Sequence, residues 1–297
     1  MYKRLFQWKD RKGAFMKGLF AAGLSLVVVL SGACIKNGVP VKNSAKGQQV
    51  AAGEGDGQDK QDVLSPEASK KQERAEDYYK KRYKKKKASS IVSLRGASKK
   101  QIRSMFYQEK ISKAVFRRMY RKSYKKGCTV PKSELRYVRV LYYGFDKKTH
   151  IGELVVNRRI SKDICSIFYQ LYCKKYPIEK MVLVDEYGAS DEKSMADNNT
   201  SSFNYRPVSG TARLSKHSYG LAVDVNPFYN PYLHTVGGKR VCEPAMARKY
   251  LNRSKSFAHK IDKKDICYKL FTKYGFSWGG NWRSVKDYQH FEKVLPR

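Results

Sequence analysis

Residues 214–227 read LSKHSYGLAVDVNP, and the second half of this stretch is an apolar run typical of a buried strand. Asp224 interrupts the run, and His217 lies seven residues before it. Burying a carboxylate costs free energy unless a partner compensates its charge. Alternation along a strand would put Val223 and Val225 on one face and Asp224 on the other. Asp224 can therefore face a partner while its neighbours fill the core.

A second stretch, GFSWGGNWRSVKDYQHFE at residues 275–292, supplies His290 and, three residues before it, Asp287. Two imidazoles and one carboxylate form a chemically sensible zinc site, and three protein ligands leave a fourth position open, as in catalytic sites. Gly220, between His217 and the strand, permits a backbone conformation or a close approach that a side chain would block. The other histidines have no such neighbours and are expected at the surface: His150, His234 and His259.

The remainder of the C-terminal part alternates between strand and helix patterns. Two strand-like runs flank a hairpin signal at residues 147–150, and a stripe at helical spacing follows them. This mixed order predicts an α+β domain over residues 128–297, with a small antiparallel sheet and flanking helices around the zinc site. The expected strands are residues 137–146, 151–157, 178–185 and 221–225, and the expected helices are residues 160–171 and 264–275.

The N-terminus has the pattern of an export signal. Residues 18–33, GLFAAGLSLVVVLSGA, follow Lys17 and end in small side chains, a run too short for an ordinary transmembrane helix. We therefore predict a signal peptide over residues 1–33. The alternatives are an uncleaved anchor helix and ordinary signal cleavage in which Cys34 has no role. The sequence LSGAC resembles a bacterial lipoprotein cleavage box, which makes Cys34 the expected lipidation site. Residues 34–78 have the composition of a tether.

The chain carries 62 Lys and Arg residues against 26 Asp and Glu residues, a formal net charge of +36. Between Lys80 and Gly127 there are 19 basic residues and one acidic residue, Glu109, so half of the net charge lies there. Residues 79–127 are predicted to be a basic, partly helical segment. Such charge implies an anionic partner, here membrane lipid or a wall polymer, and a solvated basic spacer is the equal alternative. We expect no nucleic acid, because no nucleic-acid fold motif accompanies the charge.

Export would allow disulfides. With Cys34 lipidated, five cysteines remain, so at least one thiol is free and the pairing stays open. None of the five lies in a C-x-x-C pair, which disfavours a cysteine-rich zinc module. They are Cys128, Cys165, Cys173, Cys242 and Cys267.

The two stretches together, SKHSYGLAVD at residues 215–224 and DYQHFE at residues 287–292, resemble the D-alanyl-D-alanine carboxypeptidase (VanY-like) family of zinc peptidases. That family includes L-alanyl-D-glutamate endopeptidases, and its fold is shared with D-Ala-D-Ala dipeptidases and the hedgehog signalling domain. The likeness covers roughly residues 135–295. It extends through residues 188–206, 226–232 and 278–282.

The resemblance implies Zn²⁺ as the cofactor, with His217, Asp224 and His290 as its ligands. It implies that Asp287 is the general base, with Glu292 as a competing candidate. Arg206 would bind or polarise the substrate, although a structural ion pair is an equal alternative. The resemblance also implies that three residues shape the substrate site: Ser215, Trp278 and Trp282.

These observations predict an exported, lipid-anchored, monomeric zinc peptidase of the cell envelope that hydrolyses peptidoglycan stem peptides. Its type would be a D-Ala-D-Ala carboxypeptidase or an L-Ala-D-Glu endopeptidase, and the sequence does not choose between them. The leading alternative is a zinc-stabilised domain that binds the cell wall without cleaving it. A nucleic-acid binder that uses the basic segment is a second alternative, and the export signal argues against it.

Overall fold

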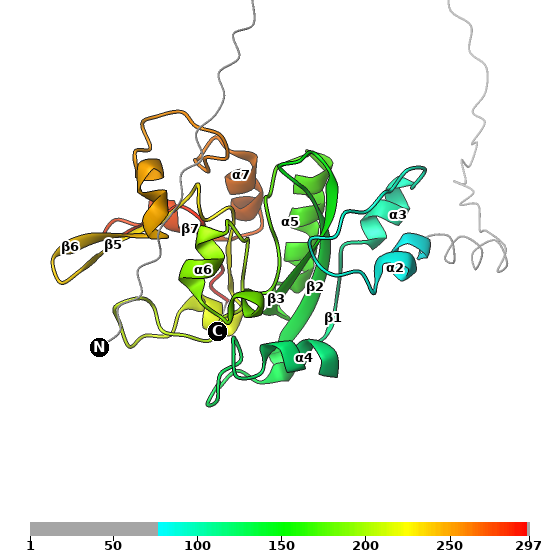
Figure 1. Ribbon diagram of the computed structural model, residues 1–297, viewed down its shortest axis with the longest axis horizontal. Helices are drawn as coiled ribbons and strands as arrows, with labels where there is room; N and C mark the ends of the chain where they lie inside the picture. The colour runs from blue at the N-terminus through cyan, green and yellow to red at the C-terminus, as the bar shows by residue number, and fades with distance from the viewer. Residues whose placement is uncertain (1–76, 296–297) are drawn as a thin grey trace, which may run out of the picture. The chain divides into compact units, whose positions relative to one another are not determined.

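The computed structural model describes residues 77–295, which are drawn in colour in Figure 1. Backbone contacts divide the chain into Met1–Gln61 and Asp62–Arg297, and every described residue belongs to the second unit. The predicted signal peptide, Cys34 and nearly all of the predicted tether lie outside the described residues. Within residues 77–295, no helix combines the length and the hydropathy needed to span a bilayer.

The largest sheet consists of β1 (Tyr107–Lys110), β2 (Leu135–Tyr143) and β3 (Thr149–Asn157), in that order and antiparallel throughout. β2 and β3 form the expected hairpin, with Leu135 opposite Asn157 and Tyr143 opposite Thr149. The amide of Gly144 donates to the carbonyl of Lys148 at 2.8 Å and closes the turn. The two strands predicted on either side of the hairpin signal are therefore confirmed, with slightly shifted ends.

Helix α5 (Ser161–Cys173) lies along this sheet (Figure 1). Its buried side chains recur at helical spacing and face the core, as a 3.6-residue period requires. The chain leaves the helix at Lys174 and reaches Pro177, which cannot continue a helix. The predicted helix is confirmed. Its buried apolar residues are Ile164, Cys165, Ile167, Phe168 and Leu171.

Two smaller antiparallel sheets complete the C-terminal part. One has the order β4 (Ala222–Asp224), β9 (His290–Glu292), β7 (Ser277–Trp278). The other has the order β6 (Lys239–Glu243), β5 (Tyr232–Val236), β8 (Lys286–Asp287). Together with the flanking helices they confirm the expected α+β class with small antiparallel sheets.

The basic N-terminal segment packs onto the same unit. It contains α2 (Tyr78–Tyr83), α3 (Lys99–Ser104), β1 and α4 (Lys113–Met119), and β1 is an edge strand of the main sheet. Its apolar side chains lie in the two hydrophobic clusters of the unit, so the composition change near residue 127 is no break in the packing. They are Tyr79, Tyr83, Met105, Phe106, Ile111, Val115 and Met119.

The predicted strand at residues 178–185 is wrong. Residues 178–183 belong to no strand and lead into the 3-10 helix η2 (Val184–Tyr187). Their backbone contacts are an isolated bridge at Lys180 and single hydrogen bonds, such as that from the Glu153 amide to the Met181 carbonyl. A side-chain amide takes the place of a partner strand, because Asn199 accepts from the Val182 amide at 2.8 Å and donates to its carbonyl at 3.0 Å. Apolar composition does not distinguish a paired strand from a buried extended segment of this kind.

The remaining elements are short and connect the sheets. The predicted helix at residues 264–275 is confirmed as α7, which Asp265 caps by accepting from the amide of Cys267. These elements are α6 (Asp191–Ala196), α7 (Ile266–Lys273), η1 (Lys132–Glu134), η3 (Lys216–Tyr219), η4 (Ala245–Leu251) and η5 (Gly279–Asn281).

Candidate metal centre

A tight turn places His217 next to strand β4. The Ser215 hydroxyl oxygen accepts from the His217 amide at 3.2 Å and caps η3. Gly220 ends η3 with a φ of +65°, in the left-handed region that favours glycine. A Cβ atom at Gly220 would lie 2.6 Å from the amide nitrogen of Asn157 on β3. Both reasons given for glycine at this position therefore hold, because the turn lies directly against the main sheet.

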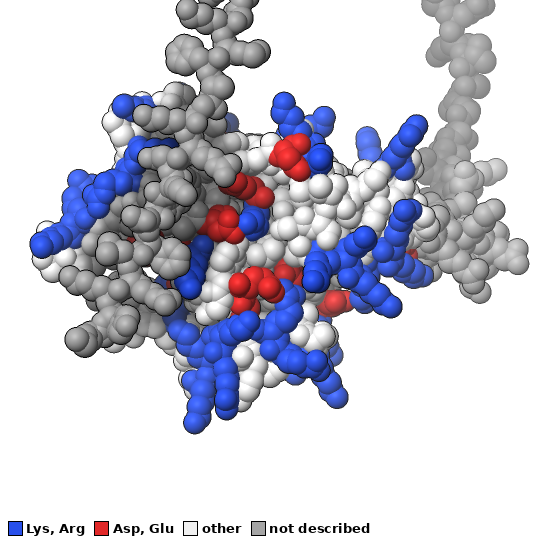
Figure 2. Space-filling view, in the orientation of Figure 1, with Lys and Arg blue, Asp and Glu red and all other residues white. Residues whose placement is uncertain are grey.

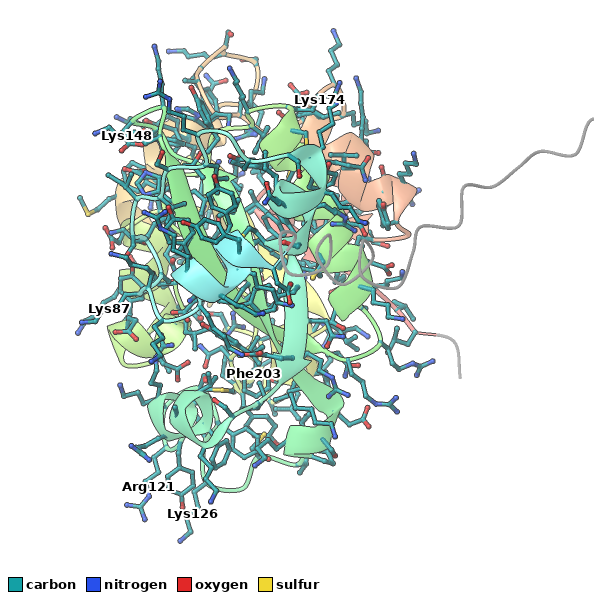
Figure 3. All side chains as sticks on the ribbon, turned by 90° about the vertical axis from the view of Figure 1, so that its right-hand side faces the viewer. Lys87, Arg121, Lys126, Lys148, Lys174 and Phe203 are labelled. Atoms are coloured by element: carbon teal, nitrogen blue, oxygen red, sulfur yellow. The ribbon has the colours of Figure 1, made fainter. Side chains whose placement is uncertain are left out.

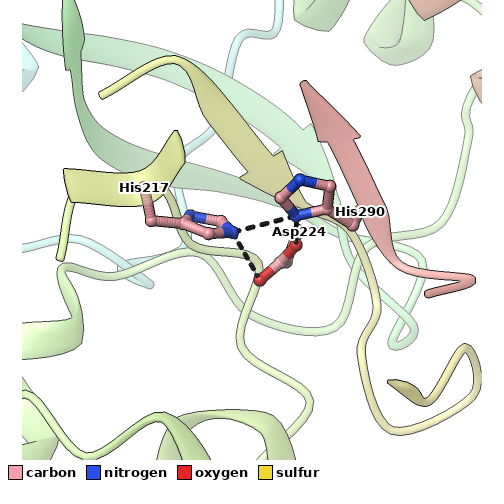
Figure 4. A group of neighbouring side chains, drawn as sticks. All are labelled: His217, Asp224 and His290. Atoms are coloured by element: carbon pink, nitrogen blue, oxygen red, sulfur yellow. Dashed lines mark hydrogen bonds and ion pairs between the residues drawn. The ribbon is translucent and has the colours of Figure 1, made fainter. Parts of the chain in front are cut away.

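His290 reaches the turn through strand pairing. It lies directly opposite Asp224 in the antiparallel register of β4 and β9. Three distances of 3.1 Å join the side chains in Figure 4: His217 Nε2 to Asp224 Oδ2, His290 Nδ1 to Asp224 Oδ1, and His217 Nε2 to His290 Nδ1. All three residues are buried, and their donor atoms lie close enough together to hold one metal ion.

Hydrogen bonds on the outer side of each imidazole decide which nitrogen faces inward. His217 Nδ1 lies 2.6 Å from the carbonyl of Ser202, which can only accept. His290 Nε2 lies 3.1 Å from a carboxylate oxygen of Glu292, which also accepts. These outer nitrogens therefore carry the hydrogens, and His217 Nε2 and His290 Nδ1 present lone pairs. Outer partners of this kind orient histidine ligands in metal sites.

The charges of His217, Asp224 and His290 favour binding of a cation between them. Burial would raise the pKa of Asp224, yet the charge and hydrogen bonds of His217 and His290 hold it far below its usual range. Burial would lower the pKa of His290, but hydrogen bonds to Asp224 and Glu292 and the charges of Asp224 and Asp287 raise it to about 10. With the outer hydrogens fixed, the two inner nitrogens would repel each other without a positive charge between them. A proton on His290 supplies that charge, and a divalent metal ion would compete with it.

The donor set fits zinc. Two imidazole nitrogens and one carboxylate oxygen are ligands that Zn²⁺ accepts, and three protein ligands leave a position for water or substrate. His217, Asp224 and His290 line a cavity of about 830 Å³, a size suited to a small substrate. The donors therefore lie where an open coordination position would meet a bound molecule.

Asp287 lies in the same cavity and has no hydrogen-bond partner for its buried Oδ1 atom. Burial raises the pKa of Asp287 to about 7; the charge of His290 opposes that shift, and the charge of Asp224 adds to it. A Cβ atom at Gly279 would lie 2.6 Å from the Asp287 carbonyl oxygen, so glycine is needed where η5 passes β8. This close approach explains why the first glycine of the WGGNW stretch, Gly279, has no side chain.

The structure brings some of the other expected site residues to the cavity. Arg206, Ser215 and Trp282 line it, and the Trp282 ring lies 5.2 Å from the ring of His290. Trp278 does not line it. The Trp278 indole nitrogen instead donates to the carbonyl of Tyr288 at 2.9 Å, and its ring is buried in the core.

Arg206 forms an ion pair with Asp191, which also lines the cavity. Of the two open interpretations of Arg206, the structural ion pair is therefore present, and it lies at the site itself. The structure also distinguishes the two candidates for the general base. Glu292 is hydrogen-bonded to His290, whereas Asp287 Oδ1 has no partner among residues 77–295.

Three features were missed or misplaced by sequence reasoning. His234 was expected at the surface, but it is 5% exposed and lies 2.9 Å from a carboxylate oxygen of Glu243. Ser202 orients His217 through a backbone carbonyl, for which a sequence has no signal. Asp191 could have been sought as a partner for Arg206, but nothing in their spacing indicates the contact. The described cysteines are all unpaired thiols in the structure.

Comparison with protein families gives one match. Residues 209–293 match the family model described as D-alanyl-D-alanine carboxypeptidase. This segment contains the three metal-ligand candidates, Asp287 and both tryptophans, and it begins just after Arg206. The resemblance inferred from the sequence is confirmed over these residues, and it indicates a hydrolase that acts on peptide bonds. Searches of curated proteins and of solved structures each found no match.

Proposed function

We propose that this protein is a zinc-dependent peptidase that hydrolyses peptidoglycan stem peptides, of the D-Ala-D-Ala carboxypeptidase or L-Ala-D-Glu endopeptidase type. One observation carries the proposal: the inner atoms of His217, Asp224 and His290 converge at the wall of a cavity of about 830 Å³. The family match over residues 209–293 supports the reaction class and suggests the substrate.

In this proposal His217 binds zinc through Nε2, His290 through Nδ1, and Asp224 through a carboxylate oxygen. Zinc supplies Lewis-acid polarisation of a scissile carbonyl and lowers the pKa of water. Ser202 and Glu292 keep the two rings in the orientation that directs the lone pairs inward.

Asp287 is proposed as the general base. It takes a proton from the attacking water as oxygen bonds to the carbonyl carbon, and it returns that proton to the amine when the C–N bond breaks. A carboxyl with a pKa near 7 can do both at neutral pH. Its buried Oδ1 atom has no hydrogen-bond partner among residues 77–295, so this oxygen has an unused acceptor position for the attacking water.

Arg206 and Trp282 are proposed to hold the substrate. The ion pair with Asp191 fixes the direction of the guanidinium at the cavity wall, where it can stabilise a developing oxyanion or bind a carboxylate. The Trp282 ring lies 5.2 Å from the ring of His290 at the cavity wall, where it can pack against a bound substrate. Ser215 acts through the turn, because its hydroxyl caps the segment that carries His217.

We place the protein in the cell envelope, on the basis of the predicted signal peptide and of Cys34 as the lipidation site. The mass of the mature N-terminus tests this assignment directly. A diacylglyceryl-modified Cys34 as the first residue supports it, and an intact Met1 or Met16 contradicts it. A Cys34→Ser variant should be extracted from the membrane fraction by high salt, whereas the acylated wild type should remain in it.

The decisive experiment incubates the zinc-loaded full chain with peptidoglycan and weighs the soluble products. Release of D-alanine identifies a carboxypeptidase, and fragments with a new D-glutamate N-terminus identify an endopeptidase. Asp287→Asn should lower the rate by about 10²–10⁴-fold without loss of zinc. Asp262→Asn, a change of the same kind at a solvent-exposed carboxylate, should leave the rate unchanged. If wild type binds peptidoglycan and releases nothing, the non-catalytic wall-binding alternative is correct.

A further inference from the structure

One end of the described unit carries a dense group of cations. Figure 1 places α4 and the turns that follow it at this end, and in Figure 3 Arg121 and Lys126 project from it, away from the ribbon. Figure 2 shows Lys and Arg side chains gathered at the same end. We call the following exposed residues the α4 surface: Lys113, Arg117, Tyr120, Arg121, Lys125, Lys126 and Lys132.

The charge of the α4 surface is not neutralised by carboxylates of residues 77–295. Three carboxylates of neighbouring segments have other partners: Glu153 and Glu186 pair with Arg118, and Glu134 pairs with Arg158. No carboxylate among residues 77–295 lies within ion-pair distance of the six cations of the α4 surface. An anion from outside can therefore approach without displacing an internal partner.

Aromatic rings lie among these cations. Tyr120 is 50% exposed, and the guanidinium of Arg121 lies 5.6 Å from its ring centre. The ammonium of Lys132 lies 5.1 Å from the ring centre of Phe116, which is partly buried beside it. Lys and Arg next to an amphipathic aromatic ring are the side chains enriched where proteins meet lipid head groups.

The backbone under the α4 surface is held firmly. Met119 is fully buried, and the amide and hydroxyl of Ser123 donate to the carboxylate of Asp185 at 3.0 Å each. Arg118 ties the last turn of α4 to Glu153 of the main sheet. The cations are therefore presented on a preformed scaffold, which reduces the ordering cost of binding.

The shape of the surface favours a membrane over a polymer strand. Proteins that follow a nucleic-acid or other polyanionic strand use a positively charged groove with stacking rings. Neither the cavity of about 830 Å³ nor a second cavity of about 380 Å³ includes a residue of the α4 surface. A protruding end with cations around one exposed ring suits a flat layer of head groups instead.

We propose that the α4 surface docks the protein onto anionic phospholipid head groups. The proposal does not depend on the peptidase reaction, and its test reads binding rather than activity. It agrees with the predicted lipidation at Cys34, which precedes this segment and lies outside the described residues.

The test compares charge reversals at the two ends of the unit. The full chain carries Cys34→Ser throughout, so that acylation does not contribute. Arg121→Glu/Lys126→Glu is compared with Lys148→Glu/Lys174→Glu, a pair that Figure 3 shows at the opposite end and that changes the net charge equally. Sedimentation is measured with vesicles that mix phosphatidylglycerol and phosphatidylcholine, with phosphatidylcholine vesicles, and with soluble poly(glycerol phosphate). Far-ultraviolet circular dichroism confirms that each variant is folded.

We expect the Arg121/Lys126 variant to lose at least about 10-fold in partition to the anionic vesicles, since each cation near such a surface contributes measurably, and the Lys148/Lys174 variant to lose less than about 3-fold. Tyr120→Ser should weaken vesicle binding without changing binding to the soluble polymer. Equal losses in the two charge variants would overturn the proposal, because net charge alone would then explain the binding. Binding to the polymer but not to the vesicles would overturn it in favour of a wall polymer.

Discussion

Two buried carboxylates of this molecule are neutralised in different ways. Glu153 on β3 is 2% exposed, and it accepts from the guanidinium of Arg118 at 2.9 and 2.5 Å and from the hydroxyl of Tyr137 at 2.6 Å. Asp224 on β4 is 8% exposed and faces two imidazoles at 3.1 Å. Burial would raise the pKa of each carboxyl, and in both cases the cationic partners lower it instead.

The difference lies in whether the compensating charge can leave. A guanidinium keeps its proton at any pH a protein meets, so the Arg118–Glu153 pair is a permanent internal contact. An imidazolium gives up its proton, and a metal ion can then take its place between the same atoms. The first arrangement connects the basic segment to the main sheet, whereas the second leaves a position for an exchangeable cation.

The largest expected effect comes from removing the charge of Asp224. Asp224→Asn keeps the shape of the side chain but removes the anion that holds the metal, so zinc content should fall to background. Activity on stem peptides should then drop by at least about 10⁴-fold, because the metal supplies a large part of the rate enhancement. Metal analysis and product release measure the two quantities. An active, zinc-loaded Asp224→Asn protein would contradict the assignment.

Removing the permanent cation beside Glu153 should reduce the stability of the fold. Arg118→Met leaves Glu153 buried with a hydroxyl as its main partner, and the free energy of unfolding should fall by about 3–5 kcal/mol. Arg117→Met, at an exposed neighbour without an ion pair, should change it by less than about 0.5 kcal/mol. Urea unfolding measures both. The double variant Arg118→Met/Glu153→Gln should recover part of the loss, and equal stabilities of the two single variants would refute the role of the pair.

The outer partner of His290 should tune metal affinity. Glu292→Gln retains an acceptor for the Nε2 hydrogen but removes the negative charge, so zinc should bind about 10–100-fold more weakly. Glu243→Gln is the matched control, because Glu243 lines the same cavity and contacts His234 in the same manner at 2.9 Å, and His234 is not one of the three metal-ligand candidates. Competition with a chelator gives both affinities. A similar loss in the two variants would show that the effect is a general one of charge.

The smallest expected effect concerns Asp265, a third carboxylate, whose charge should change the stability of the fold with pH. Burial raises the pKa of Asp265 to about 6. The neutral form therefore stabilises the fold fully below about pH 4, and this contribution is lost as pH rises through 6. Asp265→Asn keeps the cap on the Cys267 amide without the charge. It should equal wild type near pH 4 and exceed it by about 1–2 kcal/mol above pH 6, as thermal unfolding would reveal. A pH-independent difference would contradict this origin.

The metal-ligand candidates could be predicted because each is close to a recognisable local pattern. His217 and Asp224 lie on one turn and strand, and His290 lies on the strand that pairs with it, so a few residues of sequence carry most of the geometry. The main hairpin and helix α5 were predictable for the same reason, since their periodicity is local.

The rest depended on contacts between distant segments. Arg118 and Glu153 are 35 residues apart, and neither lies in a sequence pattern that predicts contact with the other. The strand wrongly expected at residues 178–185 is apolar enough for a sheet, but Asn199 takes the backbone hydrogen bonds that a neighbouring strand would have used. Trp278 and Trp282 look alike in sequence, and packing sends one to the core and the other to the cavity.

The register between β4 and β9 limits how the chain can change length during evolution. Asp224 faces His290 while Val223 faces Phe291, a core residue, so the two faces alternate residue by residue. Inserting or deleting one residue in β9 would turn Phe291 toward the cavity and His290 into the core, and the same change in β4 would exchange the faces of Val223 and Asp224. Folding and metal binding would fail in the same step. Length variation among descendants of this sequence should therefore be confined to connections such as residues 252–264.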